Sequence, residues 1–306
     1  MTKLFVMLFG FWALCFDAGA AEKIIVVTHG QAADPFWTVV KNGVEQAGQD
    51  LRVEVEYHAP ETFDMAAMAR LIEGAVAKRP DGLVVSIPDG DALKRPLEKA
   101  RKRGIPVISI NSGGEHQQAL DILLHVGQSE YEAGYGAGQK LRKLGASIGL
   151  CVNHEQGNLA LDRRCAGFKK GMNGQSATLA VNMDPTAIRN STMAYLKQHP
   201  EVDGVLTVGS ISAPSVVQSI RKLGKASTVR LGTFDSSPEI LKAIKDGGLT
   251  FAVDQQQYLQ GYLAVQTMTQ YKRLGLIPTG AIHTGPGFIT KQNADEFLEL
   301  AKRGIR

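Results

Sequence analysis

Short apolar segments alternate with amphipathic segments along most of this chain. Lys23–Thr28 is a run rich in β-branched residues, and Phe36–Asp50 follows it with apolar residues at helical spacing. The alternation recurs roughly ten times, and near-continuous apolar strands separated by helices are typical of parallel sheets buried on both faces. The pattern therefore predicts an α/β protein.

The same pattern predicts the remaining elements. The further strands are Arg52–Tyr57, Gly82–Ile87, Pro106–Ile110, Asp121–Val126, Ser147–Val152, Ala177–Asn182, Gly204–Val208, Val229–Phe234 and Leu249–Asp254. Helices are expected near Asp64–Lys78, Leu93–Arg103, Ser129–Leu144, Leu161–Met172 and Thr186–His199, and one follows each of the last three strands. One open sheet rarely holds so many strands, so the chain forms a closed barrel or two sheets. No Pro-, Gly- or Ser-rich linker divides it, so two sheets would be joined by several short crossings.

The amino terminus predicts a secretory signal peptide over residues 1–20. Lys3 precedes the uncharged stretch Leu4–Phe16, and small residues stand at Ala18 and Ala20. These features form the pattern of a signal, and we expect cleavage after Ala20. The alternative, a membrane anchor, is disfavoured because the apolar stretch is shorter than the roughly 20 residues that span a bilayer. Cys15 lacks the small neighbour of a lipidated cysteine and belongs to the removed segment.

Charge and composition exclude some function classes. The 306 residues include 34 Lys and Arg against 30 Asp and Glu, a net charge of +4 without a basic run. A nucleic-acid surface is disfavoured because phosphate neutralisation needs clustered Lys and Arg. Three cysteines are too few for a four-thiolate zinc site, and we expect neither a metal nor a cofactor.

Two cysteines remain after removal of the signal, Cys151 and Cys165. In an oxidising compartment they form either a disulfide that closes a loop of about fifteen residues or two separate buried thiols. The choice depends on their distance in space, so both alternatives stay open.

Polar and aromatic residues gather where the predicted strands end. In a doubly wound sheet a ligand binds beyond the carboxyl ends of the strands. The segments at these ends are 29–37, 111–114, 153–158 with Arg163 and Arg164, Asp235, and 254–257. Carboxylates, amides, a guanidinium and flat rings are the groups that bind sugar hydroxyls and C–H faces. The set therefore predicts a site for a small polar molecule.

Each of these residues alone has a simpler explanation. Phe36 and Trp37 at a helix start suit a hydrophobic core, Asp235 suits a helix cap, and Arg164 beside Arg163 suits a solvated helix surface. Only their shared location at strand ends supports the binding interpretation.

The order and spacing of several motifs resemble the ribose/galactose-type periplasmic sugar-binding proteins of ABC importers, which share their core with lactose-repressor-like regulators. The motifs are Asp34-Pro35-Phe36-Trp37, Gly104–Asn111, Arg164–Phe168, Gly232–Asp235, and Val253–Gln256 followed by Gly261. The resemblance extends over residues 23–306.

This resemblance implies the type I periplasmic binding protein fold, two similar doubly wound parallel-sheet lobes joined by a three-stranded hinge. The implied lobes are 21–126 with 256–283 and 127–255 with 284–306, with crossings near Val126–Gly127, Gln255–Gln256 and His283–Gly285. The implied ligand contacts are Asp34, Phe36, Trp37, Asn111, Arg164, Asp235 and Gln255. Further candidates are His154, Asn158 and Asp254, although a surface-loop role is the commoner one for His154.

The sequence departs from the ribose-binding pattern in three places. Asn111-Ser112 replaces an Asp-Arg pair, Asp34 replaces an Asn, and the position of another Asn falls near Gly209-Ser210. The lost Arg argues against an unmodified ribose site. Pentoses, hexoses, methyl pentoses and polyols all suit the groups that remain.

The expected function is capture of a monosaccharide or polyol by lobe closure, with delivery by a monomer to an inner-membrane ABC permease. A sensory protein that presents a sugar to a chemoreceptor or membrane kinase would need the same residues. An exported sugar-modifying enzyme is less favoured, because the chain has neither a Gly-x-Ser-x-Gly elbow nor an HExxH motif. The glycine-rich segment 133–138 lies within a helical pattern, where we expect it to let a helix approach a sheet. A repressor role is disfavoured by the export signal.

Overall fold

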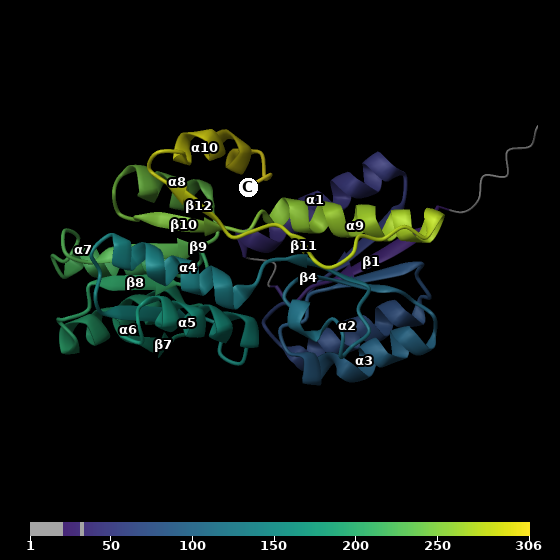
Figure 1. The fold of residues 1–306 in the computed structure, drawn as a ribbon, viewed down its shortest axis with the longest axis horizontal. Helices are drawn as coiled ribbons and strands as arrows, with labels where there is room; N and C mark the ends of the chain where they lie inside the picture. Colours follow the sequence, from purple (N-terminus) through teal and green to yellow (C-terminus); the bar gives the residue numbers. More distant parts are fainter. Residues whose placement is uncertain (1–20, 31–33) are drawn as a thin grey trace, which may run out of the picture.

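The computed structural model describes residues 21–30 and 34–306. The predicted signal peptide, its cleavage after Ala20 and Cys15 lie outside these residues. The described chain forms two α/β lobes that lie side by side (Figure 1). Each lobe contains one six-stranded sheet, so the two-sheet alternative is correct and the closed barrel is wrong.

The N-terminal lobe has a fully parallel sheet with helices on both faces. Its strands are β2 (Glu54–His58), β1 (Lys23–Val27), β3 (Gly82–Val85), β4 (Val107–Asn111), β5 (Leu124–Gly127) and β11 (Ile282–His283), in that spatial order. Its helices are α1 (Pro35–Leu51), α2 (Met65–Ala77), α3 (Gly90–Lys102), the 3₁₀ turn η1 (Gly114–His116) and α9 (Gln257–Leu274). Alternate residues of a strand point to opposite faces. Accordingly Ile24 and Val26 pack with α1 and α9, whereas Ile25 and Val27 pack with α2 and α3.

The C-terminal lobe repeats this strand order with a different edge. Its strands are β7 (Ser176–Ala180), β6 (Gly149–Asn153), β8 (Gly204–Thr207), β9 (Arg230–Phe234), β10 (Phe251–Asp254) and β12 (Gly287–Thr290). Its helices are α4 (Glu130–Lys143), α5 (Leu159–Gly171), α6 (Pro185–Gln198), α7 (Ala213–Lys222), α8 (Pro238–Lys245) and α10 (Ala294–Lys302). β12 pairs antiparallel to β10, so the prediction of parallel strands is wrong at this edge.

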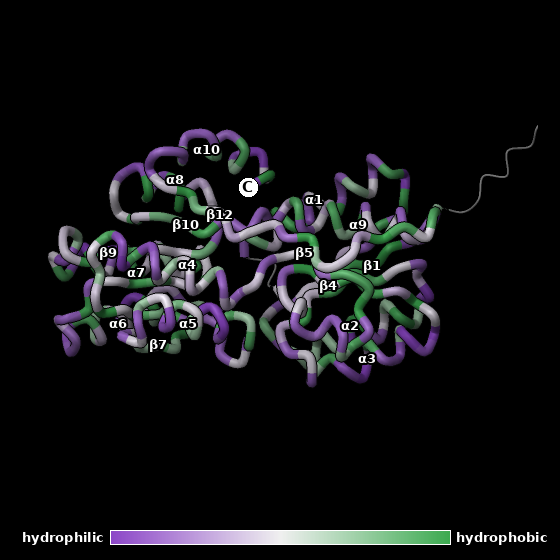
Figure 2. Tube along the Cα trace, viewed as in Figure 1, coloured by the Kyte–Doolittle hydropathy of each residue, from purple (hydrophilic) through white to green (hydrophobic). Residues whose placement is uncertain are grey.

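The ten strands predicted from the apolar pattern are all present, with ends that differ by a few residues. The pattern missed β11 and β12, which are short strands at sheet edges. β11 joins the N-terminal sheet beside β5 and β12 joins the C-terminal sheet beside β10, so tertiary contacts rather than local periodicity define them. Figure 2 shows β1 and β10 largely hydrophobic and the outer helices α3 and α10 largely hydrophilic.

The chain passes between the two sheets three times, at residues 128–129, 255–256 and 284–286. These three connections lie together at one side of the boundary between the lobes, where α9 and β12 begin (Figure 1). Within the described residues, no helix has the length and apolar character needed to cross a membrane.

Glycines bring one pair of helices together in each lobe. A Cβ on Gly134 of α4 would collide with the carbonyl oxygen of Arg164, and one on Gly167 of α5 with that of Tyr131. In the other lobe a Cβ on Gly43 of α1 would collide with the carbonyl oxygen of Tyr258, and one on Gly261 of α9 with that of Val40. The glycines of 133–138 therefore allow α4 to approach a helix, and the expectation that they face a sheet is wrong.

Candidate functional site

A polar cavity lies where the two lobes meet. Its described lining is formed by His29, Asp34, Phe36, Trp37, Asn111, His154, Glu155, Asn158, Ala160, Leu161, Arg164, Val208, Gly209, Asp235 and Gln255. These residues come from strand ends and helix starts of both lobes and from the 255–256 crossing.

The N-terminal wall of the cavity is built at the start of α1. The Oδ1 atom of Asp34 accepts a hydrogen bond of 3.0 Å from the backbone N–H of Phe36, and Pro35 occupies the first helical turn. Both features favour helix initiation. The Trp37 ring packs edge-on against Phe36 at 4.9 Å and against His29 at 4.7 Å, measured between ring centroids. The aromatic rings are therefore held in place before any ligand is bound.

A chain of amides links the two lobes through the crossing. The Nδ2 of Asn111 donates to Oε1 of Gln255 at 3.1 Å, and the Nε2 of Gln255 donates to Oδ1 of Asp235 at 2.6 Å. Asn111 follows β4 with a φ of 62° and Asp235 follows β9 with a φ of 67°. Asn and Asp tolerate this left-handed region better than most residues, and such backbone conformations are common at functional sites.

Arg164 is the centre of the C-terminal wall. Its Nε and Nη2 donate to the two carboxylate oxygens of Glu130, at 2.5 and 3.0 Å, and its Nη1 donates to the carbonyl oxygen of Val208 at 2.7 Å. Asp235 lies 4.0 Å from the same guanidinium, which stacks over the Phe234 ring. Arg164 is 3% exposed, so its assignment as a solvated surface residue is wrong.

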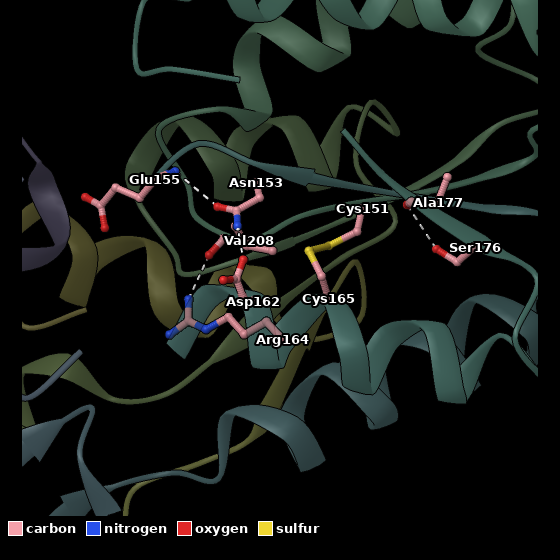
Figure 3. Close-up of a disulfide and its surroundings, with 9 residues drawn as sticks. All are labelled: Cys151, Asn153, Glu155, Asp162, Arg164, Cys165, Ser176, Ala177 and Val208. Atoms are coloured by element: carbon pink, nitrogen blue, oxygen red, sulfur yellow. Dashed lines mark hydrogen bonds between the residues drawn. A yellow bond between two sulfur atoms is a disulfide. The ribbon is translucent and has the colours of Figure 1, made fainter. Parts of the chain in front are cut away.

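A disulfide fastens the helix that carries Arg164. Cys151 of β6 is bonded to Cys165 of α5, with 5.6 Å between their Cα atoms (Figure 3). Beside it, Nδ2 of Asn153 donates to Oδ1 of Asp162 at 2.9 Å. The covalent bond and this hydrogen bond fix the first turns of α5 against β6, so the Arg164 side chain is directed from a rigid base.

The loop between β6 and α5 completes the C-terminal wall. Asn158 caps α5 through its side-chain oxygen, while its Nδ2 donates to Oε2 of Glu155 at 2.8 Å and lies 3.5 Å from Nε2 of His29 in the other lobe. His154 is buried, and its Nδ1 has no partner among the described residues. A ligand hydroxyl or ammonium group could donate to this nitrogen.

Burial changes the ionisation of the cavity groups. Together with the smaller effect of the Arg164 charge, it lowers the pKa of His29 to about 3 and that of His154 to about 4, so both imidazoles are neutral at pH 7. Burial also raises the pKa of Glu155 and of Asp235 to about 7 each, partly offset by Asn158 for the first and by Arg164 for the second. The pKa of Asp34 is raised by burial as well.

The structure brings most of the predicted site residues into one place. Asp34, Phe36, Trp37, Asn111, Arg164, Asp235, Gln255, His154 and Asn158 all line the cavity. Asp254 does not, because its carboxylate binds the guanidinium of Arg306 at the C-terminal end of the chain. We therefore leave Asp254 out of the ligand set.

Several residues of the site were not predicted. His29 and Glu155 stand at strand ends beside chosen residues, so the strand-end criterion could have found them. Glu130 begins α4, directly after the crossing at 128–129. No sequence motif marks it as a site residue, because only the fold places it against Arg164. Cys151 and Cys165, left open as a disulfide or two thiols, are joined in the structure.

Direct contacts also cross between the lobes outside the cavity. Nε of Arg163 lies 3.3 Å from a carboxylate oxygen of Glu115 in η1. On the other side of the molecule, Nδ2 of Asn42 in α1 donates to the carbonyl oxygen of Gly304 at 3.0 Å. Among the described residues, no three His, Cys, Asp or Glu side chains converge on a metal position.

The chain is similar to known sugar-binding proteins over most of its length. A xylose/arabinose-binding protein of Sulfolobus acidocaldarius is 28% identical over 92% of this chain and 74% of its own. The D-allose-binding periplasmic protein of Escherichia coli is 24% identical over 84% of this chain and 86% of its own.

Solved structures agree with this similarity. A carbohydrate transporter from Acidothermus cellulolyticus, crystallised with myo-inositol, superposes with a TM-score of 0.89 at 34% identity, covering 94% of this chain and all of the other. A periplasmic sugar-binding protein of an ABC transporter from Legionella pneumophila gives 0.81 at 26% identity, over 86% of this chain and 99% of the other. Residues 24–275 match the periplasmic binding protein domain. By its family match, its two-lobed fold and the cavity between its lobes, the chain belongs to the periplasmic binding protein domain family, in the branch whose members bind sugars for ABC importers.

Proposed function

We propose that this protein captures one monosaccharide or cyclic polyol between its lobes and delivers it to an ABC permease in the inner membrane. The observation that carries the proposal is the composition of the cavity, in which rings, amides and charges from both lobes face one enclosed space. A ligand that contacts both walls stabilises the closed arrangement over an open one by the difference in its affinity for the two.

The ligand would lie with one apolar face on Trp37 and its hydroxyls on the opposite charged wall. Arg164 donates to hydroxyl oxygens, Asp34 and Asp235 accept from hydroxyl protons, and Asn111 does both. The related proteins bind ligands of this class, since one was crystallised with myo-inositol and others are named for allose or for xylose and arabinose.

The moving units in this proposal are 21–126 with 256–283 and 127–255 with 284–306, preceded by a signal peptide removed after Ala20. The three crossings at 128–129, 255–256 and 284–286 act as the hinge. The protein acts as a monomer and does not turn over its ligand. The side chains with shifted pKa values serve binding. Asp235 is held by Gln255 beside Arg164, Glu155 is held by Asn158, and Asp34 accepts from the backbone of Phe36.

A ligand screen tests the proposal. Purified mature protein is screened by thermal shift against roughly a hundred sugars, amino sugars, polyols and cyclitols, and each hit is titrated by calorimetry. A ligand at 100 times its dissociation constant stabilises the folded protein by ~2.7 kcal/mol, which is a clear shift of the melting temperature. A 1:1 complex that is weakened by Trp37→Ala is the expected result. Absence of any hit, or consumption of the hit compound during incubation, would contradict capture without turnover.

Transport is tested separately in the source cells. Deletion of the gene should abolish uptake of the radiolabelled ligand at low concentration. Normal uptake combined with a lost chemotactic or transcriptional response would identify a sensory protein.

A further inference from the structure

The charges that line the cavity do not balance. Three carboxylates face it, those of Asp34, Glu155 and Asp235, whereas Arg164 is the one Lys or Arg side chain in the described lining. Its guanidinium is already bound on two nitrogens by Glu130, which lies behind the wall and does not line the cavity. The ion pair of Arg164 and Glu130 is neutral as a unit, so Asp34 and Glu155 have no cation of their own, and Asp235 has only this shared guanidinium at 4.0 Å.

The hydrogen bonds to these carboxylates come from neutral groups, and of the three only Asp235 also lies near a cation, 4.0 Å from the Arg164 guanidinium. Glu155 accepts from the Asn158 amide at 2.8 Å and Asp235 from the Gln255 amide at 2.6 Å, while Asp34 accepts from a backbone N–H at 3.0 Å. An amide satisfies one oxygen lone pair and leaves the charge in place. Burying charge without a counter-charge is costly, so this arrangement favours a cation or a proton at the site.

Lobe closure makes the imbalance larger. Asp34 belongs to the N-terminal wall, whereas Glu155 and Asp235 belong to the C-terminal wall. All three side chains line one cavity, so closure brings the Asp34 carboxylate toward those of Glu155 and Asp235, and the Asp34 charge raises the pKa of both. Like charges brought together in a desolvated gap oppose closure unless something positive lies between them.

Nothing else in the described site supplies that positive charge. His29 and His154 face the same space but are neutral, because burial and the Arg164 charge lower the pKa of each. Among the described residues no three ligating side chains converge on one point, so the cavity has no metal-binding site. The counter-charge is therefore either a proton on a carboxyl group or a cation that the ligand carries.

We propose that the preferred ligand is an amino sugar or amino-cyclitol, a polyhydroxylated ring whose ammonium group lies between Asp34 and Glu155 and beside the Trp37 ring. This inference rests on the proposed function and adds the chemical class of the ligand. The ammonium donates charge-assisted hydrogen bonds to carboxylates from both lobes, and the indole face adds a cation–π contact. The unpartnered Nδ1 of His154 accepts from the ligand on the C-terminal wall. Closure then brings the carboxylates toward a positively charged ammonium group instead of toward one another.

Matched ligand pairs test the inference by calorimetry at pH 7.0, where the amines are largely protonated and Glu155 and Asp235, each with a pKa of about 7, are about half ionised before the ligand binds. The pairs are D-glucosamine against D-glucose, D-galactosamine against D-galactose, and an amino-deoxy inositol against myo-inositol, with N-acetyl-D-glucosamine as a neutral amide. In at least one pair we expect the ammonium compound to bind about tenfold or more tightly than its hydroxyl counterpart.

A variant of one lining carboxylate tests whether the cavity causes the preference for ammonium ligands. Glu155→Gln keeps the shape and the hydrogen bond from Asn158 but removes one charge, so the ratio of ammonium to neutral affinity should fall about tenfold. Glu132→Gln, at an exposed position of α4, is the matched control and should leave the ratio unchanged.

The outcomes separate this inference from the function on which it rests. Binding of neutral sugars or inositol with equal or higher affinity than their amino counterparts would overturn the ammonium preference and leave capture of a neutral ligand standing. An unchanged ratio in Glu155→Gln would also overturn it. Absence of binding by every compound of the screen and of the pairs would instead contradict the proposed function itself.

Discussion

The two walls of the cavity are built in different ways. The N-terminal wall consists of rings and an amide held by a helix cap and by aromatic packing, as with Asp34, Trp37 and Asn111. The C-terminal wall holds a buried ion pair, Arg164 with Glu130, on a helix that is covalently bonded to its sheet. Both lobes have the same strand order, so the difference lies in the side chains at equivalent strand ends.

Because of this difference, the two walls contribute differently to stability and to ligand affinity. The charged wall is expensive to desolvate, and it is braced by a disulfide and by helix-to-helix contact through glycines. The aromatic wall carries less charge and supplies a flat apolar face. Changes in the C-terminal wall should therefore affect both stability and affinity, whereas polar changes in the N-terminal wall should affect mainly affinity.

The largest effect is expected from Arg164→Ala. Removing this side chain leaves Glu130 buried and unpaired, which should lower the free energy of unfolding by about 3–5 kcal/mol and weaken ligand binding by roughly a hundredfold. Denaturant unfolding and calorimetry measure the two quantities. The neighbouring Arg163→Ala is the control, because its pair with Glu115 is exposed and worth at most about 1 kcal/mol. Equal stability of the two variants would contradict the central place of the ion pair.

Removal of the disulfide should have the next largest effect. The double variant Cys151→Ala/Cys165→Ala loses a cross-link over a loop of about fifteen residues, worth about 3 kcal/mol, and should melt roughly 6–12 °C lower. Reduction of the wild-type protein should give a similar shift. Hydrogen exchange should increase in β6 and α5 and stay unchanged in β1 and α1. An equal increase in both lobes would show that the bond does not act locally.

The charge of Asp235 gives a pH-dependent effect. Its pKa of about 7 lies above its ordinary value of 3.8, so the folded state binds the proton more tightly than the unfolded state. This group therefore contributes stability that is present below about pH 4 and is lost as pH rises through 7. Asp235→Asn removes the dependence.

In thermal melts without ligand, Asp235→Asn should match the wild type near pH 4 and melt about 2–4 °C higher at pH 8. His29 and His154 act in the opposite direction, since their lowered pKa values remove stability as pH falls below 6.5, but they do so equally in both proteins. A lower melting temperature of the variant at pH 8 would mean that the Asp235 charge stabilises the wall.

The smallest effect is expected from Arg306→Ala. Arg306 binds Asp254 outside the cavity, so ligand affinity should change by less than about twofold while stability falls by about 1 kcal/mol. Calorimetry with the ligand found in the screen measures the first quantity. A loss of affinity of tenfold or more would indicate that Asp254 contributes to ligand binding.

Local chemistry explains why much of the site could be predicted. Parallel strands end at the same edge of a sheet, so polar residues after Val27 and Ile110 had to gather at one edge, and the residue after Phe234 lies at the corresponding edge of the second sheet. The residue types then indicated a polyhydroxylated ligand. The same reasoning wrongly admitted Asp254, because a one-dimensional pattern does not show that the last residue of the chain returns to occupy it.

The sequence by itself determined the alternation of strands and helices, the order of the strands along the chain and the inventory of groups at their ends, because these depend on neighbours a few residues apart. Only the tertiary structure decided that Glu130 neutralises Arg164, that Cys151 bonds to Cys165, and that carboxylates of opposite lobes share one gap. Those features depend on distances between segments far apart in the chain, and side-chain pairing, disulfide geometry and electrostatic repulsion all vary steeply with such distances.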